Sequence, residues 1–198
     1  LYARQPAGFM ISSLMQRGVA LEPALPVIRR AEPSDALRLA ELAELTFRST
    51  FEAANTPEDL RLHCAAHYSE AIQAREVSDP QIATLVGEHD GQLVGFAQLR
   101  WGRPPDCIKA ERPAEIQRLY VREAWHGKGV APDLMSAAIA LAKASHADEI
   151  WLGVWEHNPR AIAFYRKWGF AEAGEHVFPV GTDPQRDIIM TRVVGPSD

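Results

Sequence analysis

Cysteine is scarce in this chain of 198 residues, which holds only Cys64 and Cys107. Two thiols without a short repeat spacing form neither a disulfide framework nor a cysteine zinc site, and they favour the reducing cytoplasm as the expected location. The seven histidines also lack a ligand pattern. His63 and His67 are four residues apart, but no Glu-x-x-His or Cys-x-x-Cys motif accompanies them, so we expect no bound metal.

Long apolar runs and a large excess of one charge are also missing. No stretch reaches the length that spans a bilayer, and the short apolar patch at 9–14 lacks the basic start and cleavage site of a signal peptide. The net charge of −5 is mild and argues against nucleic-acid binding, which usually needs a basic face. The composition therefore predicts an ordinary globular protein that binds neither membrane nor nucleic acid and is compatible with a cationic substrate.

The length predicts one domain with an appendage. Residues 1–25 are expected to be an N-terminal extension or linker, because 19–26 is rich in Ala and Pro, and the folded domain is expected over 26–195. Within that domain the hydrophobic periodicity changes between the helical and the strand pattern several times, without an internal repeat. This order predicts a mixed α/β fold.

Local signals place the elements. Thr56 before Pro57 is a helix cap, Asp90-Gly91 is a hairpin turn, Asn158 caps another helix and Gly169 ends it. Helices are expected at about 34–53, 57–68, 69–77, 129–145 and 158–169. Strands are expected at 27–30, 82–88, 93–100, 114–121, 149–156, 170–179 and 186–194.

One loop carries most of the chemical information. It follows the strand expected at 114–121, opens the helix expected at 129–145, and consists of His126, Gly127, Lys128, Gly129, Val130 and Ala131. Free amides at a helix N-terminus bind a diphosphate, and glycines let it approach the backbone. The loop is neither a Walker loop nor a Rossmann fingerprint. By itself it is equally consistent with a simple strand-to-helix turn.

A resemblance makes this loop specific. Leu119-Tyr120-Val121 followed by the loop resembles motif A of the GNAT superfamily of N-acetyltransferases, Gln/Arg-x-x-Gly-x-Gly/Ala, in which Gly129 and Ala131 match. His126 departs from the Gln/Arg position, and Pro132 removes one amide from the first helical turn. Residues 158–170 resemble motif B, Asn-x-x-Ala-x-x-x-Tyr-x-x-x-Gly-Phe, with every fixed residue present.

A narrower resemblance is to the PaiA-type polyamine (spermidine/spermine) N-acetyltransferases, on residues 46–51, 55–60, 151–156 and 181–187. The superfamily resemblance covers roughly 27–194. It implies a central, twisted, mostly antiparallel sheet of six to seven strands, a splay between the fourth and fifth strands, and helices on both faces.

The resemblance also implies acetyl-CoA as cosubstrate and a role for each motif. The loop at 126–131 would hold the diphosphate, and the backbone of Leu119, Tyr120 and Val121 would pair with the pantetheine arm. Asn158 would contact pantetheine, and Tyr165, seven residues later on the same helix face, would be the general acid for the leaving thiolate. The simpler interpretations are a sheet strand, a helix cap for Asn158 and a core aromatic for Tyr165.

Glu115 stands where some members of the superfamily keep a general base, and strand alternation puts Gln117 and Leu119 on its face. The simpler interpretation is an edge-strand charge, and many members use water relays or backbone groups instead. For the acceptor, three acids in the first helices are candidates to hold ammonium groups, although a solvated helix end or cap is the simpler and favoured interpretation of each: Glu52, Glu58 and Asp59. Four tryptophans are candidates to line a site or fill the core: Trp101, Trp125, Trp151 and Trp155.

The sequence therefore predicts an acetyl-CoA-dependent N-acetyltransferase acting on a primary amine, a polyamine or another small amine, by direct attack in a ternary complex. Neither motif contains a cysteine, which argues against a covalent acetyl-enzyme. Three alternatives stay open. They are a protein N-terminal or lysine acetyltransferase, a catalytically silent CoA-binding regulator, and an interaction protein that forms a homodimer through residues 1–25.

Overall fold

The computed structural model describes residues 25–102 and 104–195. The extension or linker predicted at 1–25 lies outside this part, except for Leu25. None of the helices in the described part is long and apolar enough to cross a membrane.

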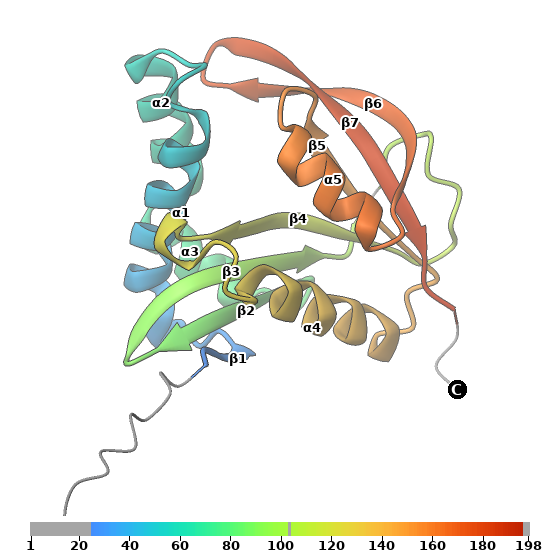
Figure 1. The fold of residues 1–198 in the computed structure, drawn as a ribbon, viewed down its shortest axis with the longest axis horizontal. Helices are drawn as coiled ribbons and strands as arrows, with labels where there is room; N and C mark the ends of the chain where they lie inside the picture. Colours follow the sequence, from blue (N-terminus) through green and yellow to red (C-terminus); the bar gives the residue numbers. More distant parts are fainter. Residues whose placement is uncertain (1–24, 103, 196–198) are drawn as a thin grey trace, which may run out of the picture.

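A seven-stranded mixed sheet forms the centre of the molecule, with the order β1-β2-β3-β4-β5-β7-β6 (Figure 1). Its neighbouring strands pair antiparallel except β4 and β5, which pair in parallel. The strands are β1 (Val27–Arg30), β2 (Ile82–His89), β3 (Gln92–Arg100), β4 (Pro113–Val121), β5 (Glu149–Trp155), β6 (Ala171–Val180) and β7 (Asp183–Val193). This arrangement confirms the predicted mostly antiparallel sheet.

The helices begin and end close to the predicted positions. They are α1 (Ala36–Phe51), α2 (Pro57–His67), α3 (Glu70–Ser78), α4 (Val130–Ala144) and α5 (Pro159–Lys167), with short 3-10 turns η1 (Pro33–Asp35) and η2 (Glu123–Trp125). Thr56 caps α2 through its hydroxyl, and Asn158 caps α5 by accepting a hydrogen bond from the amide of Ala161 at 3.0 Å. Gly169 follows α5 with a left-handed φ of 80°, as its position after the helix predicted.

Two apolar layers cover the two faces of the sheet. On one face α4 and α5 pack against β2, β3, β4 and β5 through side chains such as Leu134 and Ile162. On the other face α1 and α2 pack against β2 and β3, around Phe47 and Phe96. His63 belongs to this second layer, where its ring stacks on Phe47 at 4.2 Å. Figure 1 shows α1, α2 and α3 on one side of the sheet and α4 on the other.

The sheet opens between β4 and β5. The two strands pair only over Pro113–Glu149, Ala114–Ile150 and Glu115–Trp151, at their beginnings. Beyond Glu115 the residues of β4 continue to pair with β3, while β5 continues beside β7. The edges of the two strands that face each other are therefore left without strand partners, which confirms the predicted splay.

A β-bulge lies in β4 where this opening starts. Leu99 pairs with Ile116 and Gln98 pairs with Arg118, so Gln117 is the extra residue. The bulge reverses which face the following side chains occupy. Ile116 and Leu119 consequently both pack in the layer of α4 and α5.

Candidate active site

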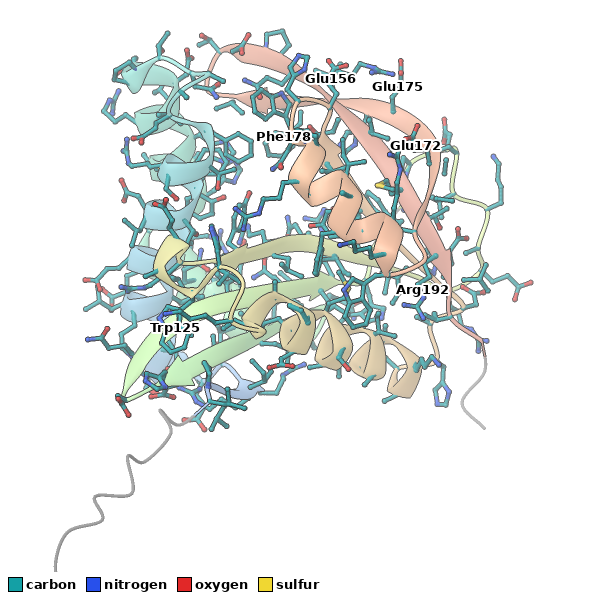
Figure 2. The ribbon with its side chains drawn as sticks, in the orientation of Figure 1. Trp125, Glu156, Glu172, Glu175, Phe178 and Arg192 are labelled. Atoms are coloured by element: carbon teal, nitrogen blue, oxygen red, sulfur yellow. The ribbon has the colours of Figure 1, made fainter. Side chains whose placement is uncertain are left out.

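A cavity of about 500 Å³ occupies the opening between β4 and β5. It runs from the loop after β4, where His126 and Ala131 line it, to the space between α1 and the β6–β7 hairpin, where Phe51 and Phe178 line it. Figure 2 shows Phe178 near α2 and the β6–β7 hairpin, far from Trp125 in η2, which marks the loop end. The cavity can therefore hold an elongated ligand that lies across the splayed strands.

The backbone of the loop presents free donors at this opening. Gly127 and Gly129 have φ angles of 76° and 89°, which side chains with a Cβ rarely adopt, and Gly129 is the N-cap of α4. Within the described part of the chain, no carbonyl or side chain accepts a hydrogen bond from the amides of Gly127, Gly129, Val130 and Ala131. Pro132 is the third helical residue, where an amide would have no acceptor in the helix, so it costs α4 no hydrogen bond.

The two basic side chains of the loop have partners of their own. His126 donates from Nε2 to the carbonyl of Val121 at 2.9 Å, which ties the loop back to the end of β4. The ammonium of Lys128 lies 5.1 Å from the ring centre of Trp125. His126 lines the cavity together with Leu119, Tyr120 and Val121. The structure thus brings the β4 segment and the start of the loop to one end of the cavity.

The helix α5 supplies a polar wall of the cavity. Asn158, Ala161 and Tyr165 all line it, as their spacing along one helix face predicts. Oδ1 of Asn158 is used in the helix cap. Tyr165 is only 8% exposed, yet its hydroxyl makes no hydrogen bond with a described residue. Burial raises the pKa of this hydroxyl to about 12. Tyr165 is therefore a protonated phenol at neutral pH whose hydroxyl is available to a ligand.

Glu115 lies outside the cavity lining. Its carboxylate is paired with Arg100, with Nη2 and Oε2 at 3.0 Å, and burial raises its pKa despite the nearby charge of Arg100. The prediction that Glu115 and Leu119 share one face is wrong, because the bulge at Gln117 reverses the alternation between them. Gln117 itself lines the cavity, and its buried Oε1 has no hydrogen-bond donor among the described residues.

The three acids predicted to bind the acceptor do not line the cavity either. Glu52 is the C-cap of α1, and Glu58 forms an exposed ion pair with Arg61 at 2.6 Å. Asp59 joins α2 to the β6–β7 hairpin, since its Oδ1 accepts hydrogen bonds from the amide and the hydroxyl of Thr182, each at 2.8 Å. Hydrogen bonds from Thr56 and Thr182 lower the pKa of Asp59. The structure places these acids at helix ends, where Glu58 pairs with Arg61 and Asp59 holds the β6–β7 hairpin.

A different acid reaches the cavity. Asp187 of β7 lines it and is 8% exposed. Trp155, Phe51 and Phe178 lie at the same end, with the rings of Phe51 and Trp155 5.6 Å apart. Sequence reasoning missed Asp187 because it reaches this place through strand pairing, opposite Trp155 of β5 and His176 of β6. No signal in the linear sequence gives that register.

Comparison with known proteins adds to this geometry. Residues 39–170 match the Acetyltransferase (GNAT) family. An uncharacterized N-acetyltransferase of Mycobacterium tuberculosis is 36% identical over 159 residues, which cover 80% of this chain and 97% of that protein. A spermine/spermidine N(1)-acetyltransferase of Bacillus subtilis is 31% identical over 90 residues, which cover 44% of this chain and 58% of that protein.

Among solved structures, the PaiA N-acetyltransferase of Thermoplasma acidophilum in complex with coenzyme A has a similar fold. The TM-score is 0.69 at 24% sequence identity, and the match covers 85% of this chain and 98% of that one. The two chains therefore share the fold over most of their length.

Proposed function

Since the chain belongs to the GNAT family of acetyltransferases, we propose that it transfers the acetyl group of acetyl-CoA to a primary amine by direct attack in a ternary complex. The observation that carries this proposal is the combination of unpartnered loop amides and the splayed β4–β5 edge along one cavity. Free donors at one end and an unpaired strand edge along the middle suit a ligand with an anionic head and an amide-containing arm.

The loop residues 126–131 are proposed to hold the diphosphate of the cosubstrate. The amides of Gly127, Gly129, Val130 and Ala131 are free to donate, and the positive end of the α4 dipole lies at the same place. Lys128 adds positive charge nearby, and His126 is proposed to contact the diphosphate through its ring. The backbone of Leu119, Tyr120 and Val121 is proposed to pair with the pantetheine arm, which would take the place of the missing strand beside β4.

The helix α5 is proposed to contact the reactive end of the arm. Asn158 keeps its Nδ2 for a ligand carbonyl, because only Oδ1 is used in the cap. Tyr165 is the proposed general acid, since its buried hydroxyl is protonated and unpartnered and can give a proton to the leaving thiolate. No cysteine is among the described residues that line the cavity, which supports direct transfer to the amine without a covalent acetyl-enzyme.

The acceptor is proposed to be a small amine, with spermidine-like polyamines as the first candidates. The Bacillus subtilis relative, named for spermine and spermidine, supports this choice. Glu52, Glu58 and Asp59 lie off the cavity, so they do not argue for a polycation. A protein N-terminus or lysine is the competing acceptor.

The test is release of free thiol from acetyl-CoA with spermidine, phenethylamine, amino acids, aminoglycosides and short peptides, together with calorimetric binding of coenzyme A. We expect turnover with at least one small amine. Tyr165→Phe should lose most of kcat, by about 100-fold, while it keeps the affinity for coenzyme A. Coenzyme A binding without turnover of any amine would instead support a silent regulator, and turnover of peptides alone would support a protein acetyltransferase.

A further inference from the structure

Asp187 is a largely buried residue whose carboxylate has no hydrogen-bond donor among the described residues. The residue is 8% exposed, its side chain is 12% exposed, and it lines the cavity. Nε2 of His176 lies 3.7 Å from Oδ2 of Asp187, beyond hydrogen-bond distance. A carboxylate that lines the cavity and has no donor of its own is available to a cationic ligand that enters there.

His176 is unsatisfied as well. Its Nε2 is buried and has no hydrogen-bond partner among the described residues, although a third of the side chain is exposed at the surface. His176 and Asp187 are opposite each other on β6 and β7. The imidazole therefore lies between the buried carboxylate and the solvent.

Glycine at position 153 makes room for this pair. A Cβ on Gly153 would lie 2.8 Å from Nε2 of His176 and 3.1 Å from Oδ2 of Asp187. Gly153 is on β5 and lines the cavity where β5 diverges from β4. Both polar side chains thus converge on the part of β5 that the splay exposes.

Tyr120 connects this place to Tyr165. Burial raises the pKa of Tyr120 well above its ordinary value, and the nearby Tyr68, Tyr165 and Asp187 raise it further. Tyr120, Tyr165 and Asp187 all line the same cavity. The aromatic rings of Trp155 and Phe178 line the same part of the cavity, and aromatic faces stabilise a cation.

We propose that Asp187 binds the ammonium group of the acceptor and removes its proton, with His176 as a positioning residue. This inference rests on the proposed function. Glu115 is less suited to this work, because it lies outside the cavity lining and is paired with Arg100.

The proton balance is complete with these groups. The ammonium gives one proton to the Asp187 carboxylate, and the free amine forms a bond to the thioester carbonyl carbon. The carbon–sulfur bond then breaks, and the thiolate takes a proton from the Tyr165 hydroxyl. The second proton lost by the nitrogen restores Tyr165, and the proton on Asp187 leaves past His176 to solvent. The products are the amide, the free thiol and one proton.

The test is Asp187→Asn, which keeps the shape of the side chain, with Glu115→Gln as the matched control. Asp187→Asn should reduce kcat/KM at pH 7 by about 100-fold or more without changing the affinity for coenzyme A. The remaining activity should rise about tenfold per pH unit up to the pKa of the amine, because the variant must use amine that is already deprotonated. Glu115→Gln should keep the wild-type pH profile.

Titration of spermidine and phenethylamine into the coenzyme A complex gives a second readout that needs no turnover. Asp187→Asn should weaken this binding at least about tenfold. If the wild type turns over amines and Asp187→Asn keeps both its kcat/KM and its pH profile, or if Glu115→Gln gains the steep profile, the assignment of Asp187 is wrong and the proposed function stands. If the wild type turns over no amine but binds amines through Asp187, the proposed function is wrong and the ammonium site stands. Unchanged coenzyme A binding shows that the variant is folded. Asp187→Ser is measured alongside it as a second variant that lacks the carboxylate.

Discussion

Gly127 allows strain and ligand binding to be separated. Its φ of 76° almost equals the 73° of Gly91 in the β2–β3 turn, and a Cβ at either position would meet no heavy atom within 4 Å. An alanine in this left-handed conformation costs about 1–2 kcal/mol. Gly127→Ala and Gly91→Ala should therefore lower the free energy of unfolding by the same amount in urea denaturation.

Coenzyme A binding should distinguish the two variants. The space beside the Gly127 amide is open to an incoming diphosphate, and a methyl group there would obstruct one or two charge-assisted hydrogen bonds from the loop. Each such bond is worth about 1.5–3 kcal/mol, so partial loss should raise the Kd by about 10- to 100-fold. Gly91 lies in the turn between β2 and β3, outside the cavity lining, and its variant should bind coenzyme A like the wild type.

Isothermal titration of coenzyme A into the wild type and both variants measures this difference. Equal Kd values for all three proteins would refute the idea that the loop amides contact the diphosphate. A weaker Kd for Gly91→Ala as well would mean that the loss reflects general strain, and the loop would lose its assignment.

Three further predictions follow from buried contacts. Burial lowers the pKa of His63 to about 4, below the ordinary 6.5, so the unfolded chain binds this proton more strongly than the folded chain. The free energy of unfolding should be highest above pH 6.5 and fall by about 1–2 kcal/mol between pH 7 and pH 5. Urea denaturation of His63→Phe, which keeps the stacked ring, should show a smaller fall. Asp59→Ala should lower the melting temperature without changing the KM for the amine, and a large change in KM would restore Asp59 as an acceptor residue. Gly153→Ala should displace the His176 ring and reduce kcat/KM about tenfold, an effect that should be much smaller when His176 is already alanine.

Much of the fold could be predicted because its signals are local. Thr56 and Asn158 cap helices in the structure as the sequence indicated, and Asp90-Gly91 forms the hairpin turn with positive φ at both residues. These residues act on the backbone within a few positions, so their effect can be read without knowing the tertiary structure.

Strand register could not be read in this way. β7 begins at Asp183, three residues before the predicted 186. Pro184 is tolerated inside the strand because it pairs opposite Pro179, and neither proline has an amide hydrogen to leave unpaired. The bulge at Gln117 leaves only a weak local signal, the consecutive polar residues Gln117 and Arg118, after which the apolar positions change phase. A one-residue shift changes the face of every following side chain, which is why Glu115 was expected beside Leu119.

The site was predictable to the same extent. The loop at 126–131 and the α5 residues Asn158 and Tyr165 came from sequence motifs, and the structure brings His126, Ala131, Asn158 and Tyr165 to one cavity. Asp187 depends on three strands pairing in one register, so its position could not be deduced before the sheet was known.

The short parallel contact between β4 and β5 has a consequence for how the protein comes apart. Among the described residues, strand pairing joins β1–β4 to β5–β7 through only three residue pairs, so the sheet consists of two halves with a narrow connection. Local opening should cost the least free energy at this narrow connection. The amide hydrogens of the two halves should therefore exchange with solvent as separate cooperative units. A ligand that contacts both halves of the sheet would link them. Ligand binding should then make the amide hydrogens of both halves exchange as a single cooperative unit.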